Sequence, residues 1–249
     1  MRNIKLILEY DGSDFFGFQR QTRKRTVQSE LESAFSKLFN RKTKISAASG
    51  RTDSGVHALG QVVNFKTESA LNLERIQKGL NRYLPKTVSV TKAEEAEEDF
   101  HARFHARNKV YEYHVWNHPA RSPLRIRQAY HFPYKLSLTK MRTAARALKG
   151  RHDFKAFCAS DRAAREQNKT TVRTIQNFQI KREGDLLIFR VQADGFLYHM
   201  VRNLVGTLLE IGQGKRPPGA IRGILASRDR RKAGRTAPAD GLFLVNVNY

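Results

Sequence analysis

A glycine-punctuated stretch, residues 49–61, concentrates the groups in this chain best suited to chemistry. Its sequence, SGRTDSGVHALGQ, places a guanidinium (Arg51), a carboxylate (Asp53) and an imidazole (His57) among three glycines. Glycine lets the backbone adopt positive φ angles and lets another molecule approach closely. A carboxylate held in such a loop can act as a nucleophile or help to generate one. The spacing therefore indicates a reactive site centred on Asp53.

The same residues also have ordinary structural interpretations. An aspartate close to glycine in a loop is most often a turn former, because its side chain bonds to the local backbone. A single loop histidine is more often a hydrogen-bonded structural residue than a catalyst. Spacing alone leaves both interpretations of Asp53 and His57 open.

The charge balance of the chain points to a polyanionic partner. Its 249 residues include 46 Lys and Arg against 23 Asp and Glu, a formal net charge of +23. Such a surplus attracts phosphates, so RNA, DNA or an acidic membrane face are the candidate partners. Basic clusters at residues 20–25 and 228–232 are separated by ordinary folded sequence. They predict a basic groove built by the fold, although any single cluster could be a solvated loop.

The composition excludes several classes of protein. A hydrophobic content of 40% and an aromatic content of 10% can form a core, in one large domain or two half-size ones. No stretch approaches the roughly 20 apolar residues of a membrane span. The first ten residues carry frequent charges, unlike a secretory signal, so we expect a cytoplasmic protein without membrane contact. The single cysteine, Cys158, excludes an intramolecular disulfide and a multi-cysteine metal site.

Hydrophobic periodicity predicts strands and helices in both halves of the chain. The expected strands cover residues 4–10, 43–48, 61–66, 110–116, 171–182, 185–193 and 241–249. The expected helices cover residues 27–38, 72–83, 138–149 and 199–212, the first of them capped by Thr26. The strands follow one another in hairpins and short runs, without regular βαβ alternation. We therefore expect an α+β fold with mainly antiparallel sheet and a boundary near residue 100.

A set of motifs resembles the bacterial tRNA pseudouridine synthases of the TruA type, in the same order and through nearly the whole chain. These motifs are YDGSDFFGFQ (10–19), GRTDSGVHA (50–58), FHARF (100–104), KVYEY (109–113), GFLYHMVR (195–202) and GLFL (241–244). Phe18 stands where the family usually has tryptophan, and Ser54 where it often has alanine. Both replacements keep the local character of the motif.

The resemblance implies a pseudouridine synthase fold of two similar halves, each with mainly antiparallel sheet flanked by helices, and a catalytic cleft between them. Residues 1–100 would carry the Asp loop, and residues 101–249 would carry a stacking tyrosine strand and an arginine helix. It further implies that uridine at about positions 38–40 of the tRNA anticodon arm is flipped out and isomerised to pseudouridine. The family uses no cofactor and no metal, and its members are homodimers.

The resemblance also assigns roles to individual residues. Asp53 matches the catalytic aspartate, and Arg202 matches the arginine that pairs with it. Tyr111 matches the tyrosine that stacks on the base, and Arg51 matches an arginine associated with extruding it. Leu242 matches a small apolar wall of the pocket. Ordinary alternatives are a solvated arginine for Arg202 and core packing for Leu242.

Two other functional classes fit parts of the sequence. A non-catalytic RNA-binding protein would explain the charge, but it would not require Asp53, Tyr111 and Arg202 together. A metal-dependent nuclease is suggested by the helical ligand spacing of His101 and His105, although no carboxylate-rich partner motif accompanies them. The polar and basic residues 159–169 are expected to form a surface loop that contacts tRNA.

Overall fold

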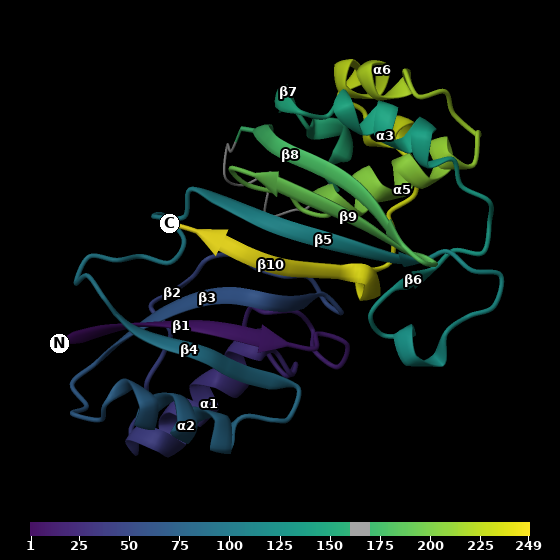
Figure 1. Cartoon of the computed structure of the whole chain (residues 1–249). Helices are drawn as coiled ribbons and strands as arrows, with labels where there is room; N and C mark the ends of the chain where they lie inside the picture. The colour runs from purple at the N-terminus through teal and green to yellow at the C-terminus, as the bar shows by residue number, and fades with distance from the viewer. Residues whose placement is uncertain (160–169) are drawn as a thin grey trace. The chain divides into compact units, whose positions relative to one another are not determined.

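The computed structural model describes residues 1–159 and 170–249, which form two compact units. The first unit comprises residues 1–107 and 243–249, and the second comprises residues 108–242. Each combines helices with mainly antiparallel strands, so the predicted α+β class is confirmed (Figure 1). The predicted basic loop lies, apart from Ala159, outside the described residues. No helix in the described ranges is long and apolar enough to cross a membrane.

In the first unit, helices lie along one side of a sheet. Its elements are β1 (Arg2–Tyr10), α1 (Val27–Phe39), β2 (Ala47–Ala48), β3 (His57–Thr67), α2 (Leu73–Tyr83), β4 (Val88–Ala96) and, from Phe243 onward, β10 (Leu242–Asn248). Strand β1 lies between β4 and β3 and is antiparallel to both. Phe243 and Leu244 of β10 pair in parallel with the first residues of β3. Helices α1 and α2 lie together against this sheet (Figure 1).

Helix α1 begins where its sequence predicts. The Thr26 hydroxyl accepts a hydrogen bond from the Ser29 amide, and the Ser29 hydroxyl is bonded to the Thr26 backbone in return. This reciprocal cap satisfies amide groups that have no partner within the helix. The apolar face of α1 is buried, and the Phe35 ring packs 4.4 Å from that of Phe65 on β3. Capping and burial together fix α1 against the sheet.

The second unit contains a hairpin flanked by helices. Its elements are β5 (Asn108–Trp116), β6 (Tyr130–His131), α3 (Leu138–Arg146), β7 (Gly150–Asp153), β8 (Val172–Glu183), β9 (Leu186–Ala193), α5 (Met200–Gly212) and α6 (Ala220–Ser227). Strand β9 lies between β5 and β8, and β7 extends the sheet beyond β8. The β8–β9 hairpin turns at Gly184, whose positive φ of 58° suits glycine. Helix α3 packs against α5 and β8.

Most predicted elements are confirmed, and the differences have identifiable causes. The predicted strand at 43–48 is reduced to Ala47 and Ala48, which lie opposite Asn64 and Val63 of β3. Helix α6 is not among the predicted helices, and its eight residues follow two prolines and a glycine. Within α5, every residue except Arg202 and Glu210 is buried.

The tight packing of α5 predicts the effect of a small substitution. A Cβ atom added at Gly206 would lie 1.7 Å from the Arg235 carbonyl oxygen, so Gly206→Ala must displace backbone. We expect it to lower the free energy of unfolding by about 2–3 kcal/mol. Gly223→Ala on α6 is the control, because nothing lies within 4 Å of its added Cβ. That variant should gain about 0.5–1 kcal/mol. Equal stabilities in urea denaturation would contradict this packing.

Candidate active site

The base of the Asp53 loop is closed by buried hydrogen bonds. The Ser49 hydroxyl bonds to Gln61 Oε1 at 2.6 Å, and Gln61 Nε2 donates to the Gly50 carbonyl at 2.9 Å. Ser49 and Gln61 are both fully buried. Buried polar groups that are fully satisfied make a local structure rigid. The loop between β2 and β3 is therefore fixed at its base.

The segment 12–18 packs directly on the loop through backbone contacts. The Phe18 amide donates to the Thr52 carbonyl at 3.1 Å. The Phe15 carbonyl accepts from the Gly55 amide at 3.3 Å and from the Ser54 hydroxyl at 3.2 Å. These bonds hold the loop on both sides of Asp53.

Two glycines of this segment make the close approach possible. A Cβ atom at Gly12 would lie 1.9 Å from the Val56 carbonyl oxygen. At Gly17, which has a φ of +85°, it would lie 2.6 Å from the Thr52 carbonyl oxygen. Any larger residue would push the two backbones apart. The DG and FGF steps of the motif at 10–19 thus have a structural explanation.

Tyr10 and His57 support the loop from inside the unit. The Tyr10 hydroxyl lies 2.8 Å from the Thr52 hydroxyl, and burial raises the pKa of Tyr10 far above its ordinary value. His57 Nδ1 accepts from the Gly12 amide at 3.1 Å, and its ring stacks on Phe243 at 4.6 Å. With 2% of its surface exposed, His57 has the environment of a structural residue. This agrees with the ordinary interpretation of that histidine.

Asp53 itself lies in a turn and is half-buried. Its carbonyl oxygen accepts from the Val56 amide at 3.2 Å, and Gly55 provides a φ of +79°. The turn is formed through the backbone of Asp53. Arg51, two residues earlier, is exposed. The loop thus carries a half-buried carboxylate and an exposed guanidinium two residues apart.

Tyr111 and Tyr113 lie in the second unit, on the same face of β5. The Tyr111 ring meets Phe196 edge to face at 4.9 Å and is 9% exposed. Tyr113 is fully buried, and its hydroxyl donates to the Pro238 carbonyl at 2.7 Å. Burial raises the pKa of Tyr113 well above its ordinary value. Tyr113 is therefore a core residue, whereas Tyr111 lies at the margin of the core.

Arg202 is anchored to residues 233–237, which we call the strap because they run along α5. Its Nε donates to the Ala237 carbonyl at 2.7 Å, and the Ala237 amide donates to the Arg202 carbonyl at 3.2 Å. The strap approaches closely because Gly206 and Gly234 have no side chains. Arg202 is thus half-buried and oriented, which differs from the solvated arginine that its helix position alone suggests.

A partly buried polar network around Asn203 bonds to the strap. Asn203 Oδ1 accepts from Arg230 at 2.8 Å and from the Thr236 hydroxyl at 2.6 Å. Asn203 Nδ2 donates to the Phe157 carbonyl, and Arg230 also donates to the Gly234 carbonyl. Burial lowers the pKa of the Arg230 guanidinium from its ordinary value. Sequence reasoning missed this role, since Arg230 falls inside a basic cluster that suggested phosphate binding.

The structure places the predicted site residues in both units. Asp53 and Arg51 belong to the first, whereas Tyr111, Arg202 and Leu242 belong to the second. Leu242 is 5% exposed at the start of β10, an environment that core packing explains equally well.

The histidines that suggested a metal site have other surroundings. His101 Nδ1 accepts from the amides of Arg103 and Phe104, which caps a local turn. The His105 amide donates to the His101 carbonyl in the same turn. Among the residues that the structure describes, no three His, Cys, Asp or Glu side chains gather as a metal-binding group.

Comparison with known proteins covers the whole chain. A family model described as tRNA pseudouridine synthase matches residues 6–105 and 144–249. The chain is 46% identical over 249 residues to tRNA pseudouridine synthase A of Acetivibrio thermocellus, with 100% of both chains aligned. It is 47% identical to the protein of that name from Geobacillus kaustophilus, covering 95% of that relative. The corresponding protein of Bacillus subtilis is 45% identical over 247 residues, which is 98% of its length.

The network around Asn203 predicts that loss of one hydroxyl group lowers the free energy of unfolding measurably. Thr236→Val keeps the side-chain shape but removes bonds to Asn203 and Arg230. We expect thermal or urea unfolding to show a loss of about 1–2 kcal/mol. Thr139→Val, at an exposed position of α3, is the matched control and should change stability little. A Thr236→Val variant as stable as its control would show that the network does not hold the strap.

Proposed function

The chain belongs to the tRNA pseudouridine synthase family, and on that premise we propose that it modifies the anticodon stem-loop of tRNA. Uridines at about positions 38–40 would be flipped out of the stack and isomerised to pseudouridine, with Asp53 as the nucleophile. The observation that carries this proposal is the loop itself. It combines the GRTDSGVHA motif with a half-buried carboxylate that is held on both sides by backbone hydrogen bonds.

The isomerisation needs little besides a positioned nucleophile. The bond between N1 of the base and C1′ of the sugar breaks, a bond from C1′ to C5 forms, and the C5 proton leaves. No atom is oxidised or reduced, and a proton replaces C1′ on N1. Attack by the Asp53 carboxylate at C1′ or at C6 of the base fits this balance. We therefore propose a reaction that uses no cofactor and no metal.

We propose that Arg202 is the cation that pairs with Asp53. A nucleophilic carboxylate must stay ionised where water is excluded, and a neighbouring guanidinium favours the ionised form. The anchoring of Arg202 Nε on the Ala237 carbonyl supports this role, because an oriented guanidinium loses little conformational freedom on pairing. Arg202 would then both hold the carboxylate in place and stabilise its charge.

The remaining residues would handle the flipped base. Taking a nucleotide out of the stack costs a few kcal/mol, and stacking on an aromatic ring returns roughly 1–3 kcal/mol. We propose that Tyr111 provides this platform, its ring held by Phe196. Exposed Arg51 would help to extrude the base, and Leu242 would form an apolar wall of the pocket.

We propose the same organisation for the whole protein as in the family that it resembles. Residues 1–100 would form the half with the Asp loop, and residues 101–249 the half with the tyrosine strand and the arginine helix. The enzyme would act as a homodimer in the cytoplasm. The positive charge of the chain supports binding to tRNA, since phosphate contacts dominate the affinity for nucleic acids.

The assignment of Asp53 is tested by tritium release from tRNA labelled at C5 of uridine. Isomerisation expels the C5 hydrogen, so wild type should release tritium and Asp53→Asn should release none. The affinity of the variant for tRNA should stay within about threefold, since asparagine preserves the shape of the side chain. Asp99→Asn, an exposed position on the same unit, should keep normal release. Tight tRNA binding with no release from wild type would instead indicate a non-catalytic RNA-binding protein.

The role of Arg202 is tested by comparing two replacements in the same assay. Arg202→Ala should lower kcat by at least about 100-fold, because the pairing charge is lost. Arg202→Lys keeps the charge but not the planar geometry, and it should retain an intermediate rate. Unchanged kcat in Arg202→Ala would remove this residue from the site.

A further inference from the structure

Helix α1 carries a buried carboxylate, Glu32, that the proposed chemistry does not use. Only 5% of its side chain is exposed. Its Oε2 accepts a hydrogen bond from the Arg20 guanidinium, and its Oε1 accepts from Gln28 Nε2 at 3.0 Å and from the Ile45 amide at 3.3 Å. A buried carboxylate is costly unless charge and hydrogen bonds compensate it. Here three donors from separate parts of the first unit provide that compensation.

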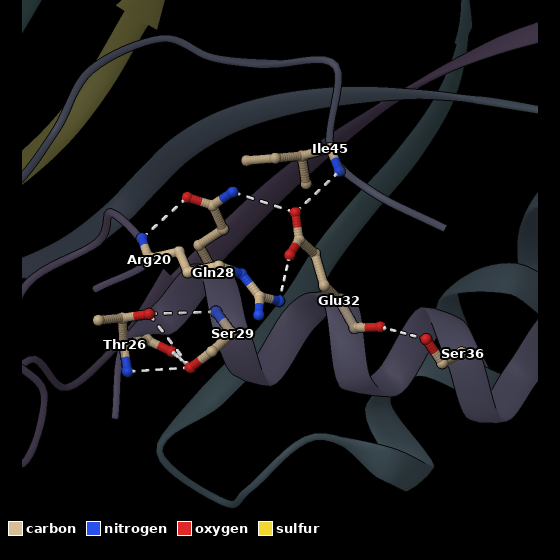
Figure 2. Close-up of polar contacts among 7 residues, drawn as sticks. All are labelled: Arg20, Thr26, Gln28, Ser29, Glu32, Ser36 and Ile45. Atoms are coloured by element: carbon tan, nitrogen blue, oxygen red, sulfur yellow. Dashed lines mark hydrogen bonds and ion pairs between the residues drawn. The ribbon is translucent and has the colours of Figure 1, made fainter. Parts of the chain in front are cut away.

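Arg20 is held at two points by this arrangement. Its backbone amide donates to Gln28 Oε1 at 3.0 Å, while its guanidinium bonds to Glu32 (Figure 2). The Arg20 side chain nevertheless remains 56% exposed. A guanidinium that is both oriented and accessible suits a phosphate, which it binds through paired N–H donors.

Arg20 begins the segment 20–25, which we call the basic arm because four of its six residues are Arg or Lys. Lys24 lies over the Phe16 ring at 4.7 Å, and Arg25 lies over the Phe15 ring at 4.9 Å. The Phe15 carbonyl also accepts a hydrogen bond from the Gly55 amide of the Asp53 loop. The basic arm is therefore attached to the same segment that packs against that loop.

Glu32 also bonds to the segment that precedes the Asp53 loop. The Glu32 carboxylate accepts a hydrogen bond from the Ile45 amide. Ile45 precedes β2, and β2 leads directly into Ser49 and the Asp53 loop. One carboxylate thus links the basic arm to the segment that enters the loop. All of these contacts lie within the first unit.

We propose that Glu32 is a positioning residue for tRNA binding, which holds Arg20 as a preorganised contact for a backbone phosphate. Fixing a cation in its binding geometry before association reduces the conformational entropy that binding must overcome. The proposal rests on the proposed function in one respect, that tRNA is the ligand. It does not depend on the role of Asp53.

The direction in which the tRNA affinity changes distinguishes a positioning role of Glu32 from a simple effect of its charge. Removal of a carboxylate from a basic region makes the local potential more positive and should strengthen RNA binding. If Glu32 positions Arg20, its removal must weaken binding instead. Glu30 on the same helix is the matched control, because its side chain is 27% exposed in its ion pair with Arg25, against 5% for Glu32.

The experiment measures the Kd of a tRNA transcript by filter binding for wild type, Glu32→Gln, Glu30→Gln, Arg20→Ala and the double variant of Glu32 and Arg20. Glu32→Gln and Arg20→Ala should each weaken binding by about 5- to 10-fold. The double variant should be no weaker than Arg20→Ala, and Glu30→Gln should bind as wild type or more tightly. In Arg20→Ala the slope of log K against log salt should fall by about 0.7–0.9. Turnover at saturating tRNA should stay within about twofold for all of them, so the effect appears in KM.

Three results would overturn the proposal. Glu32→Gln could bind tRNA as tightly as wild type or more tightly, or Arg20→Ala could leave the Kd unchanged. The third is a double variant whose loss of affinity equals the sum of the two single losses. Thermal unfolding of each variant identifies loss of structure. If Glu32→Gln does not fold, Arg20→Ala still tests the proposed phosphate contact, because the replaced side chain is exposed. Failure of wild type to bind tRNA would instead contradict the proposed function.

Discussion

The contact between two backbones, residues 12–18 and the loop at 50–56, is the constraint on which the candidate site depends. Carbonyl oxygens of the loop lie where a side chain of Gly12 or Gly17 would begin, so the contact exists only because those positions are glycine. The amides and carbonyls that meet there satisfy one another. A loop held in this way fixes the backbone of Asp53 and leaves its side chain half-buried.

The second unit meets a similar requirement in a similar way. The strap approaches α5 at Gly206 and Gly234, and the polar groups that this approach buries bond to Asn203 and Arg230. A buried network is stabilising when every member has a partner, and a half-satisfied one is costly. The network therefore makes the strap a fixed support for the Arg202 side chain. In both units glycines allow the close backbone approach that supports a residue proposed for chemistry, Asp53 in the first and Arg202 in the second.

Local signals predicted much of the fold, and long-range contacts account for what they missed. The Thr26 cap, the hairpin at Gly184 and the periodicity of α5 act over a few residues, so the sequence reveals them directly. The roles of Arg230 and Glu32 depend on partners 27 and 12 residues away, and the basic cluster that contains Arg230 suggested a solvated or phosphate-binding surface. For Asp53, spacing left a turn former and a nucleophile open. Its assignment came from the motif resemblance, and the structure adds that the turn at Asp53 is made through its backbone carbonyl.

Mapping of pseudouridine by mass spectrometry after reaction with tRNA transcripts tests the central claim most directly. The transcripts would carry uridine at about positions 38–40, where the base must be flipped before it can react. The account predicts pseudouridine in that window with the wild-type protein and none with Asp53→Asn. Pseudouridine confined to other parts of the tRNA, or formed equally well by Asp53→Asn, would contradict it.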